Sequence, residues 1–306
     1  MVKVAAVGAR GAVGGALMMV MACALIAATM LLAKALGRGV DGPALHPLQV
    51  SAGRFGFALL ALLPLLAIHR PSFRGAAWPV HGARVLCGWA GASCLFAAAA
   101  AMPLADATAI SFLSPLVTML LAIPLLGERV GAWRWGAAGV AMLGTMVLIQ
   151  PGSAAFQPAA LIALAAAGFM GMEAILIKRL STSEPLLRIL AISNGLGVLI
   201  AGAAAAPFWV APSASQWGLM ALLGLAMVTA QSLFIRATQR DDLSFVIPFF
   251  YSTLVFAGIY DLLVFGDMPS LLSAAGATLI VAAALVLAWR EQRERTKARL
   301  ADPHLG

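Results

Sequence analysis

The sequence predicts an all-α membrane protein of ten transmembrane helices, arranged as two inverted five-helix repeats with both termini in the cytoplasm. Three observations predict this fold: the composition, the recurrence of long uncharged runs, and a likeness between the two halves. Apolar residues make up 62% of the 306 residues and charged residues 10%, against roughly 45–50% and 25% in an ordinary globular domain. A soluble fold would lack the polar surface to cover itself.

The individual spans follow from the apolar runs, each long enough to cross about 30 Å of hydrocarbon with roughly 20 residues. The predicted spans are 13–33, 47–68, 85–102, 107–127, 134–151, 157–177, 186–208, 216–235, 243–265 and 269–289. Short connections with turn residues, such as "GRGVDGP" and "APSASQ", join them. The first run is longer than the roughly 7–15 apolar residues of a signal peptide, so we interpret it as an uncleaved helix.

The distribution of Lys and Arg predicts the orientation. Most of the 20 basic residues fall in segments on one side of the ten spans, among them Arg70, Arg74 and Arg84 between the second and third spans. Cytoplasmic segments are enriched in Lys and Arg, so this side is predicted to be cytoplasmic. The net charge of +8 therefore reflects topology, and the scattered basic residues argue against a nucleic-acid partner.

An internal repeat divides the chain. The stretch "ISFLSPLVTMLLAIPLLGERV" in the first half has a counterpart in "FVIPFFYSTLVFAGIYDLLVFGDMPS" in the second, and each closes with glycine and a carboxylate. We therefore predict repeats over 12–152 and 153–289, followed by a basic cytoplasmic tail, 290–306. Because each repeat has an odd number of spans, the second must enter the membrane from the opposite side, which is typical of carriers.

These motifs resemble the EamA-type transporters of the drug/metabolite transporter superfamily. The run "PLADATAISFLSPLVTMLLAIPLLGERVGAWRW" is similar to the end of that family's first repeat, and "SAGRFGFALLALLPL" to its arginine-phenylalanine signature. Asp267 stands where the family more often has Glu. The resemblance implies a multi-pass protein of a bacterial inner membrane that moves amino acids, nucleotide-like metabolites, amines or drugs.

Prolines and hydroxyl groups mark the fourth and ninth spans as candidate cavity walls. Within a membrane, neighbouring helices and Ser or Thr side chains satisfy the carbonyls that proline frees, and a bend opens space. Bends that merely improve packing are the alternative. The candidates are Ser111, Ser114, Pro115, Pro248, Tyr251 and Thr253.

Charged side chains inside spans are rare because burying one costs roughly 2.5–3.5 kcal/mol. Arg54 is a candidate ligand for a substrate carboxylate, with pairing to Asp106 or Asp261 as the alternative. Asp261 and Glu173 are candidate sites for proton or cation coupling. The alternative for Glu173 is snorkelling or pairing with nearby Lys178.

Four further polar residues have two readings each. Asn194 and Gln231 lie inside predicted spans and either bind substrate or hold helices together. Glu128 and Asp267 close the repeated motifs at span ends, where a carboxylate caps a helix or links two helices more simply than it binds substrate.

No pattern predicts catalysis or a cofactor. Cys23, Cys87 and Cys94 fall within apolar runs, and the four histidines form no metal spacing or catalytic pair. We therefore expect no enzyme, no cofactor and no metal, and the sequence leaves a homodimer open.

The predicted function is a secondary transporter that works by alternating access, with export of amino acids or related zwitterions first. The alternative is an uptake or exchange carrier for a nucleoside-like or cationic metabolite such as S-adenosylmethionine. Substrate, direction and proton coupling do not follow from the sequence. The expected partners are a small-molecule substrate and the lipid bilayer.

Overall fold

The fold is all-helical over the residues that the computed structural model describes, 10–101, 110–149, 159–265 and 271–301, with no strand among them. The helices are α1 Arg10–Gly37, α2 Pro47–His69, α3 Trp78–Ala101, α5 Ser114–Leu126, α6 Ala132–Ile149, α7 Ala159–Ser183, α8 Leu186–Ala205, α9 Ala214–Arg240, α10 Leu243–Val246, α11 Ser252–Phe265 and α12 Leu271–Ala301. Two 3₁₀ segments, η2 Ala206–Phe208 and η3 Ile247–Tyr251, follow α8 and α10.

Seven stretches of the described chain are long and apolar enough to cross a membrane, and α5 is a shorter apolar helix. The seven are Gly14–Gly37, Pro47–His69, Ala159–Ser183, Leu186–Phe208, Ala214–Arg240, Leu243–Val264 and Ala274–Glu294. The protein is therefore a multi-pass membrane protein. The other predicted spans, the third to the fifth, coincide largely with α3, α5 and α6, and the count of ten stays a prediction.

Local sequence explains where several helices begin and end. Pro47 starts α2 in the first turn, where its missing N–H costs no bond, and the His46 side chain accepts a hydrogen bond from the Leu48 N–H. A reciprocal capping box of Ser213 and Gln216 starts α9. Gly127 ends α5 with a φ of 68°, a left-handed conformation that glycine adopts without steric cost.

Pro115 and Pro248 lie at the starts of helical segments. Pro115 lies in the first turn of α5 and Pro248 in the first turn of η3. The predicted ninth span is helical throughout Leu243–Val264, with the 3₁₀ stretch η3 between α10 and α11. Proline is tolerated in a first turn because its missing N–H costs no intrahelical bond there, and the role of Pro115 and Pro248 as flex points stays a prediction.

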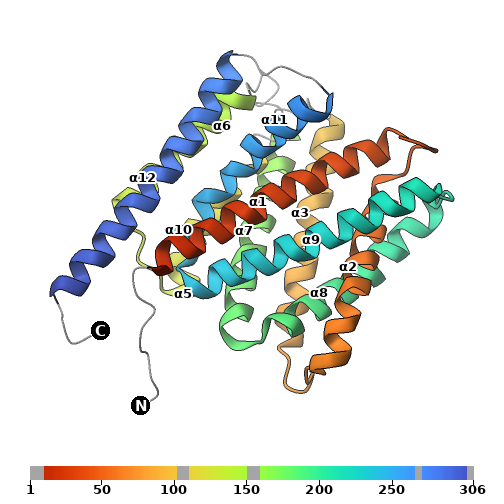
Figure 1. Ribbon diagram of the computed structural model, residues 1–306, viewed down its shortest axis with the longest axis horizontal. Helices are drawn as coiled ribbons and strands as arrows, with labels where there is room; N and C mark the ends of the chain where they lie inside the picture. The colour runs from red at the N-terminus through yellow and green to blue at the C-terminus, as the bar shows by residue number, and fades with distance from the viewer. Residues whose placement is uncertain (1–9, 102–109, 150–158, 266–270, 302–306) are drawn as a thin grey trace.

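Helices of one half pack mainly on helices of the other (Figure 1). In the described chain α1 packs on α9 and α11, while α7 packs on α3 and α5. Two further pairs, α2 with α8 and α6 with α12, also join the halves, and α6 and α12 lie side by side along one edge of the molecule.

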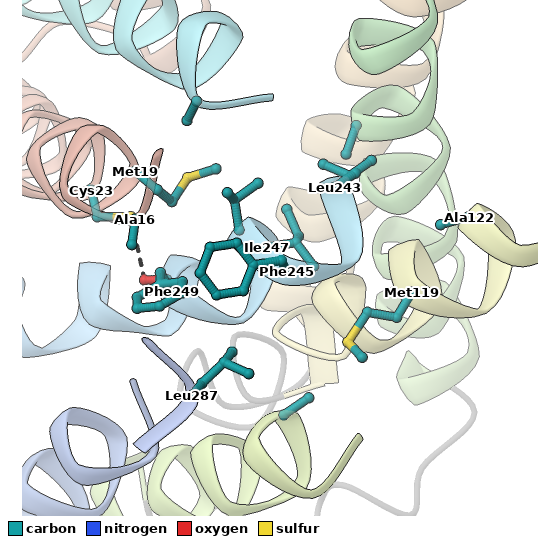
Figure 2. Close-up of a cluster of buried hydrophobic side chains, with 14 of the residues drawn as sticks. Ala16, Met19, Cys23, Met119, Ala122, Leu243, Phe245, Ile247, Phe249 and Leu287 are labelled. Carbon is teal, nitrogen blue, oxygen red and sulfur yellow. Dashed lines mark hydrogen bonds between the residues drawn. The ribbon is translucent and has the colours of Figure 1, made fainter. Parts of the chain in front are cut away.

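The segment of α10 and η3 is enclosed by the other helices. Figure 2 shows Leu243, Phe245 and Ile247 of α10 and η3 surrounded by apolar side chains from α1, α5 and α12. The Cys23 thiol of α1 donates a long hydrogen bond of 3.6 Å to the Phe249 carbonyl. Irregular backbone at membrane depth is stable only when protein covers it. The apolar cluster supplies this cover for the 3₁₀ stretch η3.

Candidate functional site: a two-chambered cavity between the halves

A cavity with a volume of about 280 Å³ lies between the two halves. Ser114, Pro115 and Thr118 of α5 line one side, and Phe250 of η3 and Phe234 of α9 line another. We call it the Phe250 chamber. Its walls are mostly apolar, and the Thr118 hydroxyl donates a hydrogen bond of 2.8 Å to the Ser114 carbonyl of its own helix.

A second cavity of about 210 Å³ adjoins it and is called the Arg54 chamber. Arg54 and Phe55 of α2, Trp89 of α3 and Gly197 of α8 line it. The Arg54 guanidinium lies over the Phe55 ring, 4.0 Å from its centroid, a cation–π contact that helps to offset burial of the charge.

The two chambers share a wall of Arg84, Glu173, Gln231 and Met227. Arg84 of α3 is 2% exposed and donates a hydrogen bond to the Ser193 hydroxyl of α8. Its Nε lies 3.9 Å from Oε1 of Glu173 on α7, beyond hydrogen-bond length. Because the Arg84 guanidinium has five N–H donors, these two contacts leave donors for a second carboxylate.

Gly88 makes room for the Glu173 carboxylate. A Cβ at Gly88 would lie 2.9 Å from the Glu173 carboxyl carbon. On the other side of the shared wall, the Asn194 amide donates to Oε1 of Gln231 at 3.3 Å and to the Leu190 carbonyl at 2.8 Å. Asn194 thus holds Gln231 in place from behind.

The structure brings together five of the residues that the sequence singled out. Ser114, Pro115 and Gln231 line the Phe250 chamber, Arg54 and Gln231 line the Arg54 chamber, and Glu173 lies between them. Glu173 faces Arg84 rather than its neighbour Lys178, whose ammonium binds the carbonyls of Thr238 and Asp241.

Four other predicted wall residues do not line either chamber. Ser111, Tyr251 and Thr253 are buried, and so is Pro248. The Tyr251 hydroxyl contacts the Met142 sulfur at 3.5 Å, and its ring lies beside Phe112. Tyr251 thus packs η3 against α6, and whether the prolines serve a cavity or only packing stays open.

The side chain of Asp261 and the whole of Asp106 and Asp267 lie outside the described residues. The pairing of Arg54 with either aspartate and the role of Asp267 therefore stay predictions. Within the described chain no group of three or more His, Cys, Asp or Glu side chains is placed to hold a metal ion.

Glu128 caps a helix of the opposite half. Its two carboxylate oxygens accept hydrogen bonds from the N–H groups of Leu243 and Ser244, each at 2.8 Å, at the start of α10. Carboxylates stabilise helix N-termini because the amides there lack intrahelical partners. Arg134 of α6 adds contacts of 3.1 Å to Asp242 and 3.0 Å to Glu291.

Arg84 is the residue that sequence reasoning missed. Hydropathy places the start of the third span at residue 85, so Arg84 counts as part of a cytoplasmic segment. In the structure α3 begins about two turns earlier, at Trp78, and Arg84 faces the cavity. Because hydropathy sets the end of a predicted span where the charges begin, a buried charged residue near the end of a helix is assigned to the loop.

A multi-pass helical protein with polar side chains enclosed in a cavity between its halves has an architecture that suits a membrane transporter. The chain belongs to the EamA-like transporter family, whose profile matches residues 13–150 and again residues 157–289. It is a transporter rather than an enzyme, and a multi-pass protein of a bacterial inner membrane.

Several relatives carry transporter names. The chain is 27% identical to an S-adenosylmethionine uptake transporter of Rickettsia prowazekii, over 82% of this chain and 86% of that protein. It is 31% identical to a riboflavin transporter of Rhizobium johnstonii, over 80% and 82%. It is 28% identical to a pseudopaline exporter of Pseudomonas aeruginosa, over 63% and 69%.

A solved crystal structure has the same fold. It superposes with a TM-score of 0.77 at 20% identity and covers 92% of this chain and 98% of that one.

Proposed function

We propose that this transporter carries zwitterionic metabolites with an amino-acid head group. The observation that supports the proposal is the shared wall, where a buried Arg84 and a partly exposed Glu173 meet at 3.9 Å. A substrate carboxylate would bind the remaining donors of Arg84, and a substrate ammonium group would bind Glu173. A solute with only one of these charges would leave the other protein charge without its partner.

The chambers on either side suit the remainder of such a substrate. Phe234 and Phe250 offer aromatic surface in one chamber, and Phe55 and Trp89 in the other. Each chamber is smaller than the roughly 300–1,000 Å³ of pockets for drug-sized ligands, but the two adjoin at the shared wall. S-adenosylmethionine, which has an amino-acid head and an adenine ring, is the candidate that the Rickettsia relative favours.

Alternating access is the proposed mechanism, with ten spans in two inverted repeats and both termini in the cytoplasm. Support comes from the double family match and from the helix pairs, since α1 relates to α9 and α11 as α7 relates to α3 and α5. The direction of net transport follows the substrate gradient, and the relatives are named for both uptake and export.

Counterflow into proteoliposomes tests the substrate class. Vesicles preloaded with one unlabelled solute are given labelled methionine, S-adenosylmethionine, adenosine, riboflavin or methylamine. We expect exchange of methionine and S-adenosylmethionine, the two solutes with an amino-acid head group, and loss of that exchange in Arg84→Gln and Glu173→Gln. Arg293→Gln is the control and should keep it, because this guanidinium stacks on Trp289 away from the cavity. Equal exchange of adenosine or riboflavin would contradict the proposal.

A pH gradient across the same vesicles tests coupling. Glu173 is the carboxylate of the described cavity wall that a proton could neutralise, and Asp261 is the second candidate from the sequence. Uphill accumulation driven by the gradient supports a proton-coupled carrier. Exchange that is indifferent to the gradient would return both carboxylates to other roles.

A further inference from the structure

A groove between α6 and α12 lies apart from the substrate cavity. It has a volume of about 270 Å³ and runs along the edge of the molecule where these two helices lie side by side (Figure 1). Small residues form its floor, among them Gly136 and Ala137 of α6 and Ala283 of α12. Trp133 and Arg290 line one end.

The groove has a basic rim and an apolar length. From Arg290 to Ala283 it follows two turns of α12, about 10 Å at 1.5 Å per residue. Arg290 stacks on Trp133 at 4.7 Å, and the next turn repeats the arrangement with Arg293 on Trp289 at 4.3 Å. Trp and Arg at one depth are typical of the membrane–water interface.

The rim has a positive balance and an unmet donor. Residues 290–299, "REQRERTKAR", contain more basic than acidic residues. Of the two acidic residues, Glu291 pairs with Arg134 at 3.0 Å, and Glu294 lies 3.7 Å from Arg290. The Nε–H of Arg290 is buried and has no hydrogen-bond partner among the described residues, while the side chain as a whole is 31% exposed, so the guanidinium can present a donor to an anionic oxygen.

We propose that this groove binds an anionic phospholipid. Its phosphate would accept hydrogen bonds from Arg290 at the rim, and one acyl chain would lie over Gly136 and Ala137 toward the bilayer centre. The charge at the rim favours an anionic headgroup over a second copy of the chain, since two copies would bring their basic rims together. The lipid is separate from the transported substrate.

Two matched pairs of variants test the proposal. An added Cβ at Gly136 or at Gly139 meets nothing within 4 Å, but only Gly136 lines the groove. Gly136→Leu should therefore fill the lipid site and Gly139→Leu should not. Arg290→Gln removes the rim charge, and Arg299→Gln removes the same charge more than two turns further along α12.

The measurement is native mass spectrometry of the purified chain titrated with phosphatidylglycerol or phosphatidylcholine. We expect a several-fold preference for phosphatidylglycerol in the wild type, kept by both controls and lost in Gly136→Leu and Arg290→Gln. Should Gly136→Leu not fold, Val286→Phe closes the groove from α12. Equal binding of the two lipids would overturn the proposal, as would a dimer that only Gly136→Leu dissociates.

Discussion

Arg84 and Glu173 are two charged side chains inside the bundle, and each reduces the cost of burying the other. A buried Arg is stable only with partners that replace water, and Arg84 has the Ser193 hydroxyl and the Glu173 carboxylate. The contact to Glu173 at 3.9 Å is looser than a bidentate salt bridge, and the Glu173 side chain is 31% exposed to the cavity. In the proposed function, this loose contact leaves room for a substrate's charged groups to bind between the two side chains.

Substitution of Gly88 should weaken transport without touching a charge. The Cβ of Gly88→Ala would lie 2.9 Å from the Glu173 carboxyl carbon and displace it from Arg84. We expect an increase of about tenfold in the half-saturating substrate concentration, which corresponds to roughly 1.4 kcal/mol. The matched control on α3 is Gly82→Ala, whose Cβ meets nothing within 4 Å; initial rates of counterflow compare the two.

Single residues of the site were predictable in proportion to their rarity. Arg54, Glu173 and Gln231 stand out from the sequence because polar groups inside apolar runs are few, and all three face the chambers. Tyr251 and Thr253 also stand out, yet they are fully buried in packing contacts. The sequence predicts that a polar residue lies within the membrane. The direction in which its side chain points depends on how the helix is rotated against its neighbours, which the sequence does not show.

At the scale of elements, most helices were predictable because a helix that crosses a membrane requires a long, uninterrupted apolar run. The ninth span departs from this regularity, because the 3₁₀ stretch η3 separates α10 from α11. Its stability depends on Glu128 from the other half, whose carboxylate binds two free N–H groups of α10. A contact between residues more than 100 positions apart leaves no local signal, although the paired Gly-carboxylate motifs marked Glu128 as a helix-end residue.

A second junction joins α3, α7 and α8 through Glu184. Its carboxylate accepts hydrogen bonds from the Ala77 N–H at 2.7 Å and pairs with His81 Nε2 at 2.9 Å, and Arg188 lies 4.0 Å away. Burial by itself raises the pKa of Glu184, but these contacts outweigh it and lower the pKa below its usual value of 4.5.

The stability of this junction should depend on pH. A carboxyl group with a lower pKa in the folded state stabilises the fold fully above its unfolded pKa, near 4.5, and loses the contribution as the pH falls through the folded pKa. We expect Glu184→Gln to lower the melting temperature in detergent at pH 7, and the difference from wild type to shrink below pH 4.5. A difference that stays constant down to pH 3 would contradict this assignment.

At the scale of the whole molecule, most contacts between the halves repeat with the roles exchanged. α1 and α7 each pack on two helices of the other half, and α2 pairs with α8 and α6 with α12, whereas the extensive packing of α2 on α9 has only a small counterpart between α8 and α3. In the proposed alternating-access mechanism, such an arrangement would let one end of the bundle close as the other opens. Glu128 and Arg134 link the two halves at the end predicted to face the cytoplasm.

A cross-link at this end should stop transport. Glu128→Cys on the loop after α5 and Asp242→Cys before α10 place thiols on either side of the Glu128 cap, in a chain without Cys23, Cys87 and Cys94. Because alternating access requires this end to separate, we expect a short bismaleimide to reduce counterflow to background in the double variant. Each single-cysteine variant, treated alike, should keep its own untreated rate. Full exchange after complete cross-linking would show that the two halves do not part at this end, and the carrier mechanism would need another gate.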